Sequence, residues 1–126
     1  MKALILLLVA ASTALGSSAV FADITDGNAL LKQCDAAVKY LDDKNPKASL
    51  SDAMYCMGLV TGVMTTLATY GSHLPKAEGT CFPDAGISAS QAVRIVAKDL
   101  RANPESLHLP GAVLAMVAFK QTYPCK

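Results

Sequence analysis

The chain has almost no excess of charge of either sign: eleven Lys and Arg residues stand against ten Asp and Glu residues, a formal net charge of +1. Without Lys2, which belongs to the N-terminal segment discussed below, the two totals are equal. Proteins that bind nucleic acid usually carry a basic excess that neutralises phosphates. The composition therefore argues against a nucleic-acid partner.

The sequence also lacks the common motifs of catalysis and metal binding. It contains no C-x-x-C, no H-x-x-x-H, no P-loop and no Rossmann glycine pattern, and His73 and His108 stand far apart. Asp42 and Asp43 are neighbours, so on a helix their carboxylates diverge and cannot act as a pair. We therefore predict no catalytic residue, no metal site, no cofactor and no enzymatic activity.

The N-terminus has the three parts of a secretory signal peptide. Lys2 precedes an apolar run that is too short to span a membrane, and Val20 and Ala22 occupy the −3 and −1 positions of a cleavage site. Removal of residues 1–22 leaves 104 residues, 23–126, the size of one small domain.

Four helical segments and no convincing strand can be recognised in that domain. They cover residues 26–43, 49 or 51 to 71, a segment from residue 88 onward, and 110–123, with one short turn at 104–108. The third begins with an S-x-x-Q capping box, Ser88 and Gln91. Its outer face carries a basic ridge of Arg94, Lys98 and Arg101, which a solvated surface explains by default.

The second segment is uncharged from Ala53 to Pro75, so a membrane span has to be considered. Threonines at positions 61, 65 and 69 form a polar stripe, and this favours the central, mostly buried helix of a soluble bundle. Gly58 and Gly62 lie four residues apart, and we expect them to admit a neighbouring helix of the same domain instead of forming a membrane-type dimer seam. No membrane span is expected after removal of the signal peptide.

The stretch NPESLHLPG, residues 103–111, places a histidine between two prolines. We expect Asn103 to cap a single turn, Pro104 to begin it, and Pro110 to start the last helix. His108 then has two interpretations. Either its ring nitrogen caps the junction or is solvated, which is the default, or it sits on a stiff protrusion that enters a partner's cleft.

The four cysteines of this exported chain indicate two disulfides, for which the sequence alone allows three connectivities. Helices joined by short connections favour an antiparallel bundle. In that arrangement Cys34 and Cys56 lie at nearly the same height, and Cys81 and Cys125 mark helix ends that meet. We therefore predict the pairs Cys34–Cys56 and Cys81–Cys125 in an all-α, compact four-helix bundle with one additional short turn.

Three stretches resemble one known family. DGNALLKQC (26–34), YCMGLVTGV (55–63) and the segment from CFPDAG to YPC (81–125) follow the order of motifs in the Rap/Tai amidase-immunity proteins of type VI secretion. The resemblance covers nearly the whole mature chain. It implies a helical, homodimeric protein of the Gram-negative periplasm that binds a peptidoglycan amidase effector and blocks its cysteine–histidine active site.

A protein that inhibits by occlusion needs a rigid protrusion, because preorganised elements lose less entropy on binding. The third helix and the turn after it are therefore the candidate effector-binding surface, with Lys98, Arg101, Asn103, Glu105 and His108 as candidate contacts. Two other functions remain open: a small periplasmic chaperone that opens in acid and protects clients, and a family member whose partner is no longer an amidase.

Overall fold

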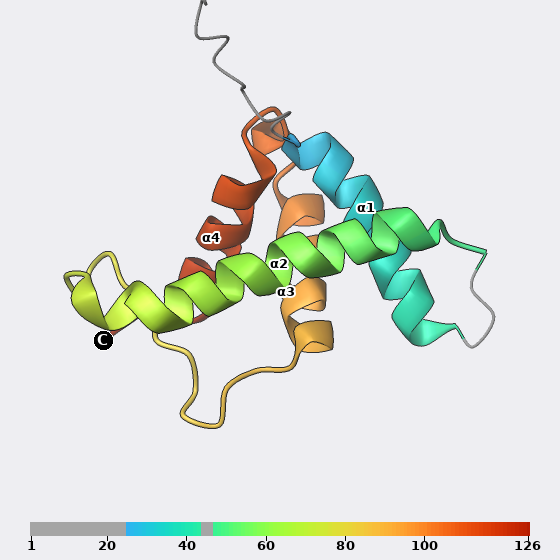
Figure 1. Ribbon diagram of the computed structural model, residues 1–126. Helices are drawn as coiled ribbons and strands as arrows, with labels where there is room; N and C mark the ends of the chain where they lie inside the picture. The colour runs from blue at the N-terminus through green and yellow to red at the C-terminus, as the bar shows by residue number, and fades with distance from the viewer. Residues whose placement is uncertain (1–24, 44–46) are drawn as a thin grey trace, which may run out of the picture.

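The computed structural model describes residues 25–43 and 47–126 (Figure 1). The predicted signal peptide, residues 1–22, lies outside the described residues. The elements are α1 (Gly27–Asp42), α2 (Leu50–Tyr70), the 3₁₀ turn η1 (Gly71–His73), α3 (Ala89–Ala102), the 3₁₀ turn η2 (Pro104–Ser106) and α4 (Gly111–Thr122). The described residues form no strand beyond two isolated bridges, so the all-α prediction is confirmed.

Three of the four helices begin at a side chain that caps them. The Asp26 carboxylate accepts from the backbone N–H of Ala29 at 2.9 Å, and the hydroxyls of Ser49 and Ser88 accept from the N–H three residues ahead at 3.3 and 3.2 Å. Each bond satisfies one N–H that has no partner within its helix. The Gln91 amide donates to the Tyr123 hydroxyl at 3.4 Å, which ties the start of α3 to the end of α4.

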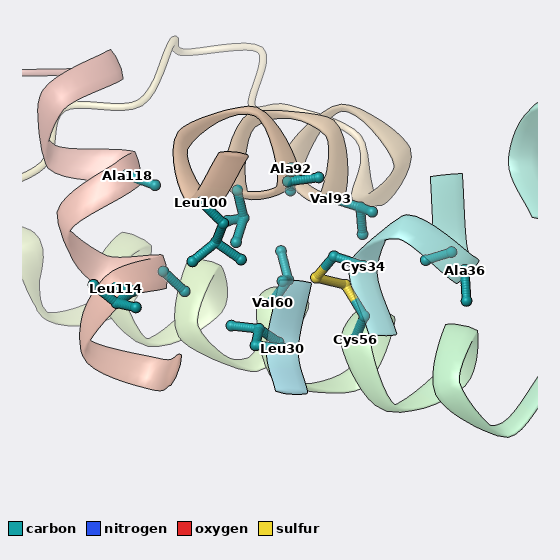
Figure 2. Packing of buried hydrophobic residues seen from close by; sticks show 14 of the residues in the cluster. Leu30, Cys34, Ala36, Cys56, Val60, Ala92, Val93, Leu100, Leu114 and Ala118 are labelled. Carbon is teal, nitrogen blue, oxygen red and sulfur yellow. A yellow bond between two sulfur atoms is a disulfide. The ribbon is translucent and has the colours of Figure 1, made fainter. Parts of the chain in front are cut away.

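The helices pack as one unit in which each α-helix contacts the other three. In Figure 1, α2 lies across the other three helices instead of running alongside them. The core lies between these helices, and its largest fully buried side chains include Leu30, Val60, Leu100 and Phe119 (Figure 2). The α3 helix supplies the most regular apolar stripe, on the side opposite its charged residues.

Two disulfides hold the helices together. Cys34–Cys56, here called the core disulfide, joins α1 to α2, and both cysteines are fully buried (Figure 2). Cys81–Cys125, the loop disulfide, joins the connection before α3 to the chain after α4. The Cα atoms are 5.0 Å apart in both pairs, and the connectivity is the one expected from the helix heights. On the loop-entropy model, each closure stabilises the fold by about 3–4 kcal/mol.

The expected burial of the second helix is wrong. Only Ala53, Cys56 and Val60 are buried among the 21 residues of α2, because the other helices cover one side of it. The Thr61 hydroxyl donates to the Met57 carbonyl at 2.6 Å, and the Thr69 hydroxyl donates to the Thr65 carbonyl at 2.8 Å. These threonines therefore satisfy their donors within the helix, and the polar stripe does not mark which side faces water.

Candidate functional site

The stretch 103–111, here called the joint, connects α3 to α4 and is tied to the start of α1. The backbone N–H groups of Gly27 and Asn28 donate to the carbonyls of Leu109 and Leu107 at 2.9 and 3.1 Å. The N–H of Gly111 donates to the Thr25 carbonyl at 2.7 Å, and the Asn28 amide donates to Leu107 as well. The first N–H groups of α1, which lack partners in their own helix, are thereby satisfied. The joint is held by long-range bonds and is no free loop.

The close approach of α1 to the joint requires glycine at two positions. A Cβ on Gly27 would lie 2.8 Å from the Leu107 Cα and 2.9 Å from the Leu107 carbonyl oxygen. A Cβ on Gly111 would lie 2.9 Å from the Thr25 carbonyl oxygen. Backbone atoms cannot move aside as side chains do. These two glycines therefore fix how closely the joint and α1 pack.

The side chain of Asn103 does not cap η2, which corrects the expectation from the sequence. Its amide donates backward instead, to the Asp99 carbonyl at 2.9 Å and to the Asp99 carboxylate at 3.3 Å. The acceptor is the Asp99 carbonyl in the last turn of α3, which also accepts the backbone N–H of Asn103 at 3.1 Å. Asn103 thus closes the C-terminus of α3, and Pro104 still begins the turn as expected.

Glu105 and His108 are exposed on the outer side of the joint. The His108 Nδ1 lies 3.0 Å from the Glu105 carbonyl oxygen, so the imidazole closes the turn that carries it. This geometry agrees with the default interpretation, in which the ring caps the junction. It also holds the imidazole in place at the surface, where a partner can reach its other nitrogen.

The basic ridge is divided by ion pairs with α1. Arg94 makes a two-pronged contact with Asp42, at 2.6 and 3.3 Å, and Arg101 pairs with Asp35. The hydrogen bond from Arg94 lowers the pKa of the Asp42 carboxyl, and the same bond raises the pKa of Arg94. Arg101 is therefore turned toward α1, and it reaches a partner only at the edge of the α1–α3 contact.

Lys98 lies on the other flank of α3, where it lines a shallow groove between α3 and α4. Asp99, Gln121 and Thr122 share this groove, whose volume is about 330 Å³. Burial raises the pKa of the Asp99 carboxyl. Asn103 does not line the groove itself but is bonded to Asp99, which does. Glu105 and His108 form a separate cluster on the joint. The five candidate residues thus occupy three neighbouring places and not one continuous patch.

The titratable groups of the described residues offer no metal-binding cluster. No three His, Cys, Asp or Glu side chains within residues 25–43 and 47–126 gather into such a site. All four cysteines of the chain are bridged. A cysteine nucleophile would need a thiolate, which a disulfide does not supply.

A second surface, which the motif search missed, lies between α2 and α4. Gly58 and Gly62 face outward, and a Cβ at either position would meet nothing within 4 Å. The expectation that these glycines admit a neighbouring helix of the same domain is therefore wrong, because no described residue packs closely against either of them. A hollow of about 250 Å³ borders both glycines and is closed on one side by Met116 of α4.

Two features of the sequence mark this surface in retrospect. α2 is the one helix among the described residues that is long and apolar enough to cross a membrane. α4 is apolar nearly all round, yet Val113, Met116 and Val117 are about 40% exposed. Apolar residues in excess of what the core can bury indicate an interaction surface, and a search for polar motifs does not detect them.

Comparison with known proteins gives one match. A family model described as Rap1a immunity proteins matches residues 26–125. No curated protein and no solved structure matches the chain.

Proposed function

Since the chain belongs to the family of Rap1a immunity proteins, we propose that it binds a type VI-secreted peptidoglycan amidase and occludes the amidase active site. The producing cell's own wall is thereby protected. The protein acts as a homodimer and performs no catalysis itself. Its partner is the cognate effector, and it needs no cofactor.

The observation that carries this proposal is the anchoring of the joint. Three hydrogen bonds donated by Gly27 and Asn28, and a fourth donated by Gly111 to the Thr25 carbonyl, hold its inner side. Glu105 and His108 stand exposed on its outer side. An edge that is already ordered loses little conformational entropy when it enters a cleft. Its imidazole and carboxylate can bond to the polar groups of a cysteine–histidine active site.

The periplasm is the compartment that this proposal requires, because the cell wall and the delivered amidase meet there. Two disulfides in a small chain are typical of an oxidising compartment and support this location. The signal-peptide pattern of residues 1–22 points to the same export route. Both observations support a protein that meets its partner outside the cytoplasm.

The test is binding to the amidase encoded beside this chain, together with rescue of cells in which that amidase is sent to the periplasm. Alanine at both Glu105 and His108 should weaken binding at least tenfold and reduce rescue, since few residues carry most of the energy of an interface. The matched control is alanine at His73 and Glu78. These are the only other histidine and glutamate of the chain, and both are exposed.

The control should bind and rescue like the wild type. Equal loss in both double variants would mean that the joint has no special role. Absence of both binding and rescue in the wild type would remove the immunity function itself.

A further inference from the structure

One uncharged surface runs across two helices, and none of the residues in 25–43 and 47–126 covers it. We call it the α2–α4 face, and its central residues are Gly58, Gly62, Thr66, Val113, Met116 and Val117. Met116 borders the hollow over the two glycines. Val113, about one turn before Met116, and Val117, the residue directly after it, are partly exposed beside it on α4. The hollow and these exposed residues of α4 are therefore continuous.

The glycines of this face weaken the helix, and no described residue makes a compensating contact with them. A glycine in a helix interior costs about 1 kcal/mol relative to alanine. Gly27 and Gly111, the first residues of α1 and α4, permit a close backbone approach, but nothing lies within 4 Å of a Cβ at Gly58 or Gly62 in the interior of α2. The described part of the chain therefore offers no close contact that would favour glycine at these two positions.

The face is suited to being covered by an apolar partner. No charged residue occurs between Ala53 and Pro75, and the only charge within α4 is Lys120, one turn beyond Met116. The Thr66 hydroxyl donates to the Gly62 carbonyl at 2.9 Å, so its donor is already satisfied. Covering the face would therefore leave few polar groups without partners.

We infer that a second copy of this chain docks on the α2–α4 face. This inference rests on the homodimer of the proposed function and names the surface that forms it. A two-fold interface uses the same patch on both copies, so the patch must contain both a projection and a hollow. Met116 is the projection, the space over Gly58 and Gly62 is the hollow, and methionine adapts its shape to such gaps.

The size and the neutrality of the face agree with that occupant. The 21-residue α2 is roughly 31 Å long and the 12-residue α4 roughly 18 Å, and at a width of roughly 10 Å each they give a footprint on the order of 500 Å² before surface relief is counted. A standard interface buries about 800 Å² on each partner. Because the face has no charge, it cannot select a partner by charge, whereas a copy of itself matches it in polarity.

A lipid bilayer is the other class of cover that an apolar helix suggests, and the core disulfide argues against it. Cys56 of α2 is fully buried and bonded to Cys34 of α1. The inner side of α2 is part of the domain core, so the helix cannot enter a bilayer without pulling the core apart. A bilayer could therefore cover only one side of this helix.

The experiment measures self-association of the exported, oxidised protein by sedimentation over a concentration series. The wild type should form a dimer. Met116→Glu and Gly62→Glu each place a carboxylate in the contact and should raise the dissociation constant at least about 100-fold. The matched control is Tyr40→Glu on α1, which also replaces an exposed apolar residue, 43% exposed against 40% for Met116. It should remain dimeric.

Each outcome decides a separate point. Dimers that persist in both glutamate variants, with the helix content of the wild type by circular dichroism, would overturn the assignment of this face. A wild type that is monomeric throughout would overturn both the assignment and the homodimer. Binding of the wild type to phospholipid vesicles, lost in Met116→Glu, would replace the second copy by a membrane. Failure to neutralise the amidase would remove the immunity function and leave the dimer surface intact.

Discussion

Replacement of Gly27 by alanine tests whether the joint is held by its contact with α1. Gly27 does not have a positive φ, so alanine suits its backbone conformation. The obstacle is space. The new methyl group would meet the Leu107 backbone at 2.8 and 2.9 Å and the Leu114 side chain as well. Leu114 can change its rotamer, but the backbone of the joint has to move.

The cost follows from that displacement. Adding a methyl group to a well-packed contact typically costs 1–3 kcal/mol. Gly58→Ala provides the internal comparison, because its methyl group meets nothing and a helix gains up to about 1 kcal/mol when alanine replaces glycine. The two variants should thus differ by about 2–4 kcal/mol in the free energy of unfolding, with opposite signs relative to the wild type.

Denaturant unfolding monitored by circular dichroism measures the difference, with both substitutions made in the Met116→Glu background to remove the contribution of self-association. For a domain of this size, 1 kcal/mol corresponds to about 4–8 °C in melting temperature. The amidase should also bind more weakly to Gly27→Ala, since Glu105 and His108 move with the joint. A Gly27→Ala variant as stable as Gly58→Ala would refute the close packing of α1 on the joint.

Three further predictions follow from the same contacts. Below about pH 4 the wild type should lose more stability than Asp42→Asn, because the folded state lowers the pKa of Asp42. The stabilisation from its carboxylate is present above the unfolded-state pKa and disappears as the pH falls through the folded-state pKa. Parallel acid-unfolding curves would contradict it. Mild reductant should open the loop disulfide before the core disulfide, because Cys81 is exposed whereas Cys34 and Cys56 are fully buried; alkylation followed by mass spectrometry reads the order. Leu30→Ala should cost 2–5 kcal/mol in urea unfolding, as Leu30 is fully buried among the helices, and a cost below 1 kcal/mol would argue against this core.

The features that the sequence predicts well are those with local causes. Ser88 caps its helix as predicted, and of the two possible starts of the second helix, Ser49 and Ser51, the structure selects Ser49. In both cases a hydroxyl reaches an N–H three residues ahead, whatever the rest of the fold does. The disulfide pairs are predicted from residue counts and the rise of helices in an antiparallel bundle, and both pairs are present although α2 crosses the other helices. Neither inference needs knowledge of which side of a helix is covered.

The joint shows where local reasoning stops. The Asn103 side chain can bond either to carbonyls at the end of α3 or to N–H groups at the start of η2. The sequence pattern predicts only the second kind of bond, a helix cap. The structure resolves the competition in favour of the Asp99 carbonyl. The bonds from α1 to the joint cross about 80 residues of sequence, and no local pattern announces them. These contacts require glycine at positions 27 and 111. The spacing of the two glycines in the sequence does not indicate that they lie close together.

The largest error of the sequence analysis is the expectation that α2 is mostly buried, and this error has a physical cause. Periodicity identifies which residues of a helix share a face, but an apolar helix without a clear polar side gives no information about which face is covered. A chain of this size offers three other helices, and they cover α2 from one side, where the core disulfide fixes it. The groove with Lys98 lies between α3 and α4, whereas the hollow at Met116 lies between α2 and α4, so α4 separates them. A copy seated on the α2–α4 face would therefore complete the cover of α2 and leave the Lys98 groove open to the amidase.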